Sequence, residues 1–220
     1  TPLGEAVSLG IHESQSRRWE NHVGRSAAFW KWCWPLTQQH LGAACQGYTA
    51  ESVFRTANVV QPSLIRVEAD ELTYDLHVMV RFEIEQALSD GQLGASNLPE
   101  RWNELYREYL GLQVPDDKNG CLQDVHWSCG LFGYFPTYTL GNLYAAQFAA
   151  TADQALGGLS QLLERGQFET LREWLRRYVH VHGRRYTPAE LCQRVTGKPL
   201  SSDAFLAHLD RKLTAVYQIA

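Results

Sequence analysis

The sequence of 220 residues is long enough for one sizeable domain, or for part of a larger one. Hydrophobic residues make up 45% and charged residues 20%, which is typical of a globular protein and excludes a disordered chain; no apolar run is long enough to span a membrane. The formal net charge is −4 and there is no basic stripe, so we expect a small molecule, a peptide or another protein as the partner rather than nucleic acid.

The first polar cluster in the chain is His12-Glu13-Ser14-Gln15, in the stretch LGIHESQSRRWENHVGR. We expect a helix here. In an HExxH zinc helix the second His would stand at Ser16, so His12 and Glu13 cannot hold a metal by that motif alone. A His-Glu pair on a helix is more often a surface pair than a metal site, and that interpretation stays open at this point.

The next segment, NVVQPSLIRVEADEL, begins with β-branched residues interrupted by Pro62 and then turns acidic. This pattern predicts a loop or a short strand that enters a helix, so we allow at most a strand pair near residues 57–68. The following stretch, TYDLHVMVRFEIEQAL, is apolar on more than one face, which predicts a deeply buried helix.

Helical patterns continue through the rest of the chain. PERWNELYREYLG has its apolar residues at helical spacing, and Thr187-Pro188-Ala189-Glu190 is a capping box that starts another helix. Residues 171–179 and 206–216 predict two more helices on the same spacing. Before these two helices, residues 119–142, NGCLQDVHWSCGLFGYFPTYTLGN, form an irregular segment rich in Gly and aromatic residues, as functional loops often are. We therefore predict an all-α fold in which residues 1–220 form a single unit.

The cysteines are five in number and form no CxxC pair. An odd number without close pairs argues against a disulfide framework and against a structural zinc site. No charged and then apolar leader precedes the first helix. These features predict a reducing, cytoplasmic location.

The amino-acid sequences of three segments resemble the motifs of one family. HESQS, IRVEAD at 65–70 and GCLQDVHW at 120–127 occur in this order, with PLGEAVSLG before the first and GYFPTYTLG after the last. Together they closely resemble the carboxypeptidase Taq family of zinc metallocarboxypeptidases. The resemblance implies a helical metallocarboxypeptidase fold, a homodimer, and removal of residues from peptide C-termini. It also implies zinc, held by two His of an HExxH helix and by the Glu of the HES motif.

By that resemblance Glu13 is the zinc ligand, while His12 and Gln15 orient the ligands or contact the substrate. Arg66 is the candidate for binding the terminal carboxylate, because its planar guanidinium suits a carboxylate. We expect Glu68 and Asp70 to orient Arg66 or to cap the next helix.

The GCLQDVHW segment would line the cleft, with Gln123 and His126 as hydrogen-bonding groups near the substrate or the metal. Tyr138, or in second place Tyr134, would donate a hydrogen bond to the oxyanion that develops during attack. On this assignment Tyr138 and His126 are the catalytic groups.

The family's HExxH helix precedes its HES motif, and HExxH occurs nowhere in these 220 residues. We therefore expect the C-terminal part of a metallocarboxypeptidase, which by itself neither keeps zinc nor turns over substrate. Two alternatives remain: a split enzyme that pairs with a separate N-terminal half, and a non-catalytic module that binds peptide C-termini or forms a dimer.

Overall fold

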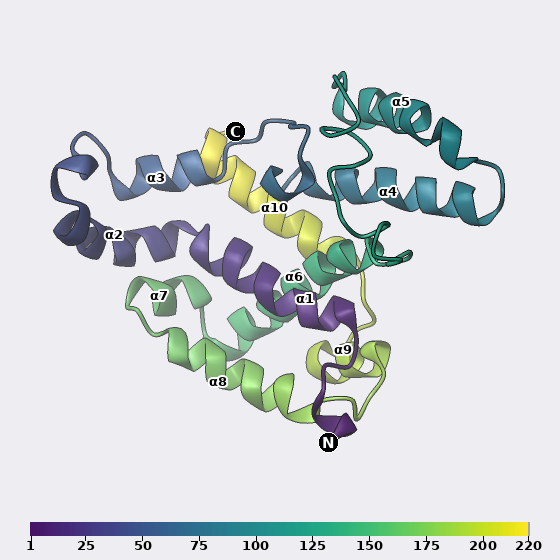
Figure 1. The fold of residues 1–220 in the computed structure, drawn as a ribbon. Helices are drawn as coiled ribbons and strands as arrows, with labels where there is room; N and C mark the ends of the chain where they lie inside the picture. The colour runs from purple at the N-terminus through teal and green to yellow at the C-terminus, as the bar shows by residue number, and fades with distance from the viewer. Residues whose placement is uncertain (220) are drawn as a thin grey trace. The chain divides into compact units, whose positions relative to one another are not determined.

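The computed structural model describes residues 1–219, and within that range the regular elements are helices without any strand (Figure 1). The α-helices are α1 (Leu9–Arg17), α2 (Ala27–Leu41), α3 (Ala50–Ala57), α4 (Tyr74–Ser89), α5 (Leu98–Leu110), α6 (Pro136–Leu156), α7 (Leu159–Glu164), α8 (Phe168–Tyr178), α9 (Pro188–Thr196) and α10 (Asp203–Tyr217). The predicted all-α fold is confirmed. Near residues 57–68 the chain leaves α3, runs without regular structure past Pro62 and closes a 3-10 turn at Arg66–Glu68.

The chain divides into two compact units. The terminal unit comprises Thr1–Val59 and the residues from Leu140 onward, and the middle unit comprises Val60–Thr139. The chain passes from the middle to the terminal unit within α6. That residues 1–220 all belong to one catalytic domain stays a prediction.

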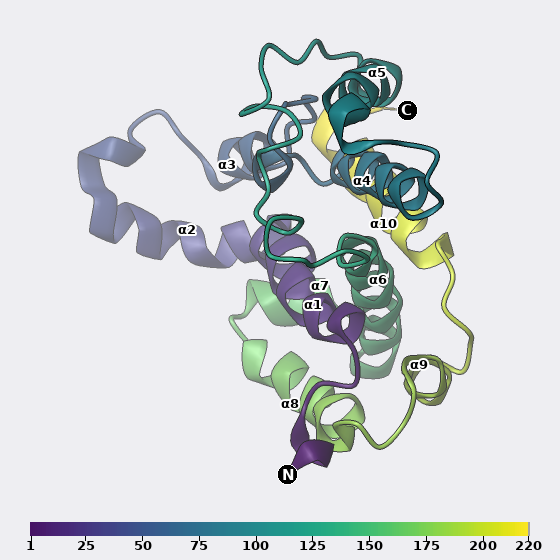
Figure 2. The ribbon, with the colours of Figure 1, turned by 45° about the vertical axis from the view of Figure 1, so that its right-hand side comes forward.

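The terminal unit has its core along α6, α8 and α9. Phe148, Leu175 and Cys192 are completely buried there, and α6 is apolar on several faces because it is surrounded by other helices. Helix α2 runs alongside α3 and α7 (Figure 2). Trp32 of α2 packs edge-on against Phe168 with ring centroids 4.7 Å apart.

The middle unit is built on α4 and α5, which pack against each other. Trp102, Leu105 and Tyr106 of α5 are buried against Val80 and Ile84 of α4. The helix ends at Gly111, whose φ of 69° is a left-handed conformation that favours glycine. The predicted amphipathic helix is thus confirmed. The predicted deep burial of α4 holds for only part of its surface, because Met79 and Phe82 are each 43% exposed.

The capping box of α9 is confirmed: Thr187 accepts from the backbone N–H of Glu190, and Glu190 accepts from the backbone N–H of Thr187. Thr187→Ala should lower the free energy of unfolding by about 1 kcal/mol, because an orphan N–H of the first turn loses its partner. Urea denaturation measures this. Thr214→Ala, the same change at an exposed position inside α10, should have no such cost; equal losses at both positions would contradict the capping role.

No helix in the described range is long and apolar enough to cross a membrane. All five cysteines are free thiols, and three of them are buried.

Candidate functional site

Glu13 lies on α1, whose first turn is fixed by Ser8: its Oγ accepts from the backbone N–H of Ile11 at 3.1 Å. The stem of Glu13 lies against Gly141 of α6. A Cβ atom on Gly141 would stand 2.9 Å from both Cβ and Cγ of Glu13. Because glycine has no side chain, position 141 leaves room for the Glu13 side chain and so sets the direction in which the Glu13 carboxylate points away from α1.

The Glu13 carboxylate is half-buried and has no hydrogen-bond or ion-pair partner among residues 1–219. The described part of the chain also contains no group of three His, Cys, Asp or Glu side chains that could share a metal ion. A catalytic zinc needs three protein ligands, and the described residues hold no cluster that would supply three.

The other two predicted residues of α1 differ in their surroundings. His12 is exposed. Gln15 is held on both sides, because its Nε2 donates to Ser14 Oγ at 2.8 Å and its Oε1 lies 2.8 Å from Nε2 of His180. His180 comes from the 3-10 turn His180–His182 after α8. His180 thus has its partner in the HESQS segment, far away in the sequence.

Directly after α1 the backbone continues as a π-helix, Arg18–Gly24. Such i→i+5 stretches are rare and occur frequently at functional sites. Arg17, the last residue of α1, donates from Nε to Asn142 Oδ1 at 2.7 Å, so α1 and α6 are joined again one turn beyond Glu13. Nothing in the residue pattern of 18–24 predicts the change of helix type.

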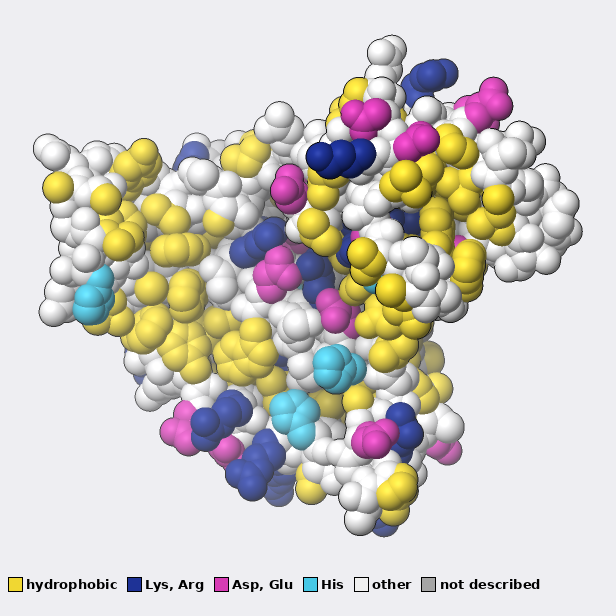
Figure 3. Space-filling model, viewed as in Figure 1, with side chains coloured by type: hydrophobic (Ala, Val, Ile, Leu, Met, Phe, Trp, Pro, Cys, Tyr) yellow, Lys and Arg dark blue, Asp and Glu magenta, His cyan; other side chains and the backbone are white. Residues whose placement is uncertain are grey.

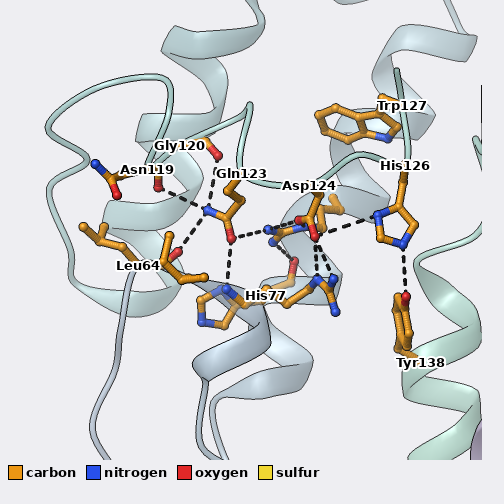
Figure 4. A network of polar contacts seen from close by, with 12 residues as sticks. Leu64, His77, Asn119, Gly120, Gln123, Asp124, His126, Trp127 and Tyr138 are labelled. Atoms are coloured by element: carbon orange, nitrogen blue, oxygen red, sulfur yellow. Dashed lines mark hydrogen bonds and ion pairs between the residues drawn. The ribbon is translucent and has the colours of Figure 1, made fainter. Parts of the chain in front are cut away.

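In the middle unit, the residues of the second and third motifs meet in one buried network (Figure 4). The carboxylate of Asp124 accepts from two guanidinium groups: Arg66 Nη2 at 2.7 Å, and Arg81 Nε at 2.7 Å. Arg66 is 4% exposed and Arg81 is 0% exposed. Burial opposes the charged form of Asp124, but its bonds to Arg66 and the charge of Arg81 outweigh burial, so the pKa of Asp124 lies below its ordinary value.

Gln123 holds the same network together through backbone groups. Its Oε1 accepts from the backbone N–H of Arg66 at 2.9 Å and from Arg81 Nη2 at 2.8 Å. Its Nε2 lies within 3.2 Å of the carbonyl oxygens of Leu64, Asn119 and Gly120. Gln123 thus connects the loop after Pro62 to the GCLQDVHW segment.

The expectation that Glu68 and Asp70 orient Arg66 is wrong for both residues. Asp124 and the Tyr74 hydroxyl, 2.8 Å from Arg66 Nη1, orient the guanidinium instead. Glu68 is exposed. Asp70 accepts from the backbone N–H groups of Leu72 and Thr73, just before α4, which agrees with the alternative expectation that it caps the next helix.

His126 and Tyr138 meet at the edge of this network. Nε2 of His126 lies 3.0 Å from the Tyr138 hydroxyl, and its Nδ1 lies 3.8 Å from Asp124 Oδ1 (Figure 4). Burial lowers the pKa of His126, as do the positive charges of Arg66 and Arg81, although Asp124 opposes them. The imidazole is therefore neutral at pH 7.

Tyr138 stands in the first turn of α6, and its ring covers Arg66 with 4.7 Å between the guanidinium carbon and the ring centroid. Tyr134 keeps ring contacts with His126 and Tyr138, at centroid distances of 5.3 and 5.5 Å. The structure thus brings Arg66, Gln123, His126, Tyr134 and Tyr138 together within the middle unit.

Two further members of the network were missed from the sequence. Arg81 supplies the second guanidinium that bonds to Asp124. His77 is fully buried, and its Nδ1 lies 3.1 Å from the Tyr106 hydroxyl. A signal for Arg81 existed: an Arg inside a helix that is apolar on several faces requires a buried acid. Glu85 was also missed; it accepts from Trp127 Nε1 and from the backbone N–H of Gly133, and so fixes the aromatic segment.

Acid should destabilise the chain through His77. Burial, helped by the charges of Arg81 and Arg66, lowers the pKa of His77 to about 3. The unfolded chain takes up a proton below its ordinary pKa of about 6.5, so this contribution is complete above that pH and is lost as the pH falls toward 3. Urea unfolding at pH 7 and pH 5 should show a smaller pH dependence for His77→Gln than for the natural chain. His12→Gln, at an exposed His, is the control; a natural chain equally stable at both pH values would contradict the prediction.

Comparison with known proteins agrees with these motifs. Residues 1–213 match the family model described as carboxypeptidase Taq (M32) metallopeptidase. The chain is 52% identical over 217 residues to thermostable carboxypeptidase 1 of Thermus thermophilus. The aligned residues cover 99% of this chain and 42% of that protein. It is 41% identical to carboxypeptidase 1 of Bacillus subtilis, over 99% of this chain and 43% of that protein.

Solved structures show the same relation. The M32 carboxypeptidase of Deinococcus radiodurans R1 is 46% identical, with a TM-score of 0.96 over 100% of this chain and 44% of that one. Metallocarboxypeptidase 1 of Trypanosoma cruzi is 41% identical, with a TM-score of 0.92 over 96% of this chain and 44% of that one. The chain spans less than half the length of these relatives. With its three motifs, its helical fold and a family match over nearly all of its length, the chain belongs to the carboxypeptidase Taq (M32) family of metallopeptidases.

Proposed function

We propose that residues 1–220 are the C-terminal portion of the catalytic domain of a zinc-dependent carboxypeptidase that removes residues from peptide C-termini, and that this polypeptide alone is inactive. The observation that carries the proposal is Glu13. Its stem is positioned by Gly141, and its carboxylate has no partner among the described residues. A ligand in this position needs two further ligands from elsewhere to hold zinc, which would polarise the substrate carbonyl and a bound water.

Arg66 is the proposed binding group for the terminal carboxylate. It shares Asp124 with Arg81, so these three bonded side chains carry one more positive than negative charge. Because the groups are buried, that excess charge acts at low dielectric and favours an anion nearby. Asp124 and Tyr74 would keep the guanidinium in place before the substrate arrives.

Tyr138 is the proposed oxyanion donor, and its bond to His126 supports that choice over Tyr134. In this proposal the unprotonated Nε2 of a neutral His126 accepts a hydrogen bond from the Tyr138 hydroxyl in the resting state, and the hydroxyl, which keeps its proton, donates to the substrate oxygen instead when substrate binds. In an active, complete enzyme Tyr138→Phe should lower kcat by about 10²–10³ with little change in KM, as loss of an oxyanion donor does. Tyr134→Phe keeps the ring contacts and should cost much less; equal losses would contradict the assignment.

The test of the whole proposal begins with metal analysis of the purified chain and with an assay on a blocked dipeptide with added zinc or cobalt. We expect far less than one metal per chain and no turnover. Adding the remaining N-terminal part of the Thermus thermophilus relative should then restore zinc binding and turnover to the natural chain but not to Glu13→Gln. Glu100→Gln, an exposed position, is the matched control. One metal per chain with turnover by the chain alone would refute the proposal.

A large apolar surface supports association with further polypeptide. Figure 3 shows hydrophobic side chains gathered over α2, where Leu36 is 44% and Leu41 is 59% exposed. Exposed apolar patches of this kind mark interaction surfaces. The proposed partners are the N-terminal part of the enzyme and, as in the family, a second copy of the protein. A cytoplasmic location stays a prediction.

A further inference from the structure

A cavity of about 550 Å³ lies in the terminal unit, and side chains of α6, α10 and the π-helix Arg18–Gly24 contribute to its wall. Three short side chains of α6 line it: Ala146, Ala149 and Ala150. Ala146 also packs against Phe205 and Leu209, so α10 is fixed to α6 beside the cavity. Small-molecule sites typically measure about 300–1,000 Å³. The cavity is therefore large enough for a small organic molecule.

The side chains of α10 that line this cavity are basic. His208, Arg211 and Lys212 are three and four residues apart, a spacing that places them on one face of the helix. His22 of the π-helix also lines the cavity, and the centroids of the His22 and His208 rings are 3.9 Å apart. Lys212 Nζ donates to the carbonyl oxygen of Asn21 at 2.7 Å, which holds the ammonium group next to His22 in the chain. Nitrogen donors from two elements thus meet at one cavity.

The charged groups of the wall leave an excess of positive charge. Arg211 and Lys212 oppose a single carboxylate, that of Asp153, whose Oδ1 accepts from the backbone N–H of Leu159 at 2.6 Å. Arg211 has no hydrogen-bond or ion-pair partner among residues 1–219. The two imidazoles add positive charge whenever they are protonated, and two protonated rings in contact repel each other unless an anion lies nearby. The wall therefore favours an anion over a cation or a neutral molecule.

These donors suit a phosphate group better than a carboxylate. A carboxylate has one negative charge and two oxygens in a plane, whereas a phosphate monoester has three acceptor oxygens and a charge of about −1.5 to −2 at pH 7. The guanidinium of Arg211 can donate two parallel N–H groups to such oxygens, and the ammonium of Lys212 acts on them as a point charge. An imidazole that gains a proton supplies one more donor. A dianion thus matches both the charge and the donors of the wall.

We propose that this cavity binds the phosphate group of a small phosphorylated molecule, with Arg211, Lys212, His208 and His22 as the donors. The organic part of the molecule lies against the alanine side chains of α6. Binding favours the protonated imidazoles, because the dianion compensates the repulsion between the two rings. None of these residues belongs to the proposed peptidase site, so each of the two proposals can fail without the other.

Isothermal titration calorimetry of the 220-residue chain tests the site, with inorganic phosphate and glycerol phosphate as probes and ionic strength held constant with sodium chloride. Both should bind, and glycerol phosphate should bind more tightly because its glycerol part fills more of the cavity. Arg211→Met should weaken both by roughly ten- to a hundredfold, as expected for the loss of a hydrogen bond between charged groups. Arg107→Met, the same change at an exposed position of α5, is the matched control and should bind like the natural chain.

A second readout follows the imidazoles directly. Sulfate is a tetrahedral dianion that does not itself titrate near neutral pH. In NMR spectra of the natural chain, sulfate should move the ring resonances of His22 and His208 toward those of the protonated form. The ring of His12, which is exposed and outside the cavity, should not respond. By reciprocity, sulfate should bind more tightly at about pH 6 than at about pH 8.

The outcomes separate a built site from general attraction of ions to the surface. No binding of either phosphate probe, binding that Arg211→Met leaves unchanged, or ring resonances of His22 and His208 that do not respond to sulfate would each overturn the site. Equal affinity for inorganic phosphate and glycerol phosphate would overturn the phosphorylated organic ligand and assign the cavity to a free phosphate ion.

Discussion

Asp124→Asn should lower the free energy of unfolding by about 3–5 kcal/mol, the largest stability effect we expect from a single substitution in this chain. The change keeps the shape of the side chain but removes the charge that two buried guanidinium groups share. Arg66 and Arg81 would then repel each other without compensation in a region that excludes water. Urea denaturation followed by tryptophan fluorescence measures the loss.

Asp90→Asn, the same change at an exposed residue after α4, is the control and should alter stability by less than about 0.5 kcal/mol. The cost of Asp124→Asn should also depend on pH. The folded state lowers the pKa of Asp124, so its contribution is complete above the ordinary carboxyl pKa and is lost as the pH falls through the lowered value. A variant as stable as the natural chain at pH 7 would show that the two Arg groups do not depend on this carboxylate.

Gly141→Ala should lower the free energy of unfolding by about 1–3 kcal/mol, although alanine normally stabilises a helix by up to about 1 kcal/mol over glycine. The added Cβ would meet the stem of Glu13 at 2.9 Å and its backbone carbon at 3.3 Å. Since the backbone cannot give way as a flexible side chain can, α1 must shift. The Glu13 carboxylate would shift with it, so the variant should also bind zinc more weakly once the missing ligands are supplied.

Gly4→Ala is the matched control, because the nearest atom to its added Cβ is Thr1 Oγ1 at 3.9 Å. Differential scanning calorimetry of both variants should show a lower Tm for Gly141→Ala alone. A stabilised Gly141→Ala would mean that the two helices can separate freely and that the glycine does not position Glu13.

The helices could be predicted from the sequence because their signals are local. The spacing of apolar residues in α5 and the capping box of α9 each lie within a few residues, and both helices formed as expected. Pro62 lies in the one segment with strand-like composition, and proline has no backbone N–H to donate to a neighbouring strand. No strand formed in the described residues of that segment.

The pairing of the polar residues could not be predicted in the same way. Glu68 and Asp70 are close to Arg66 in sequence, yet its partner Asp124 is 58 residues away. Local patterns carry no information on which distant acid reaches a given Arg. Glu13 was identified by resemblance to a family, since nothing in the residues alone separates a zinc ligand from a surface carboxylate.

The Gln123 side chain has a consequence for how the middle unit folds. It bonds to backbone groups of two separate stretches, at Leu64 and Arg66 and at Asn119 and Gly120, and to the Arg81 side chain of α4. Such contacts close long loops, and the entropy of that closure is lost before any of the bonds can form. Opening one of the two stretches leaves unpaired groups in the other and in α4, so partial unfolding gains little conformational entropy at a high energetic cost. The unit should therefore fold late and open as a single cooperative block, while the loop tips outside it exchange their amide hydrogens independently.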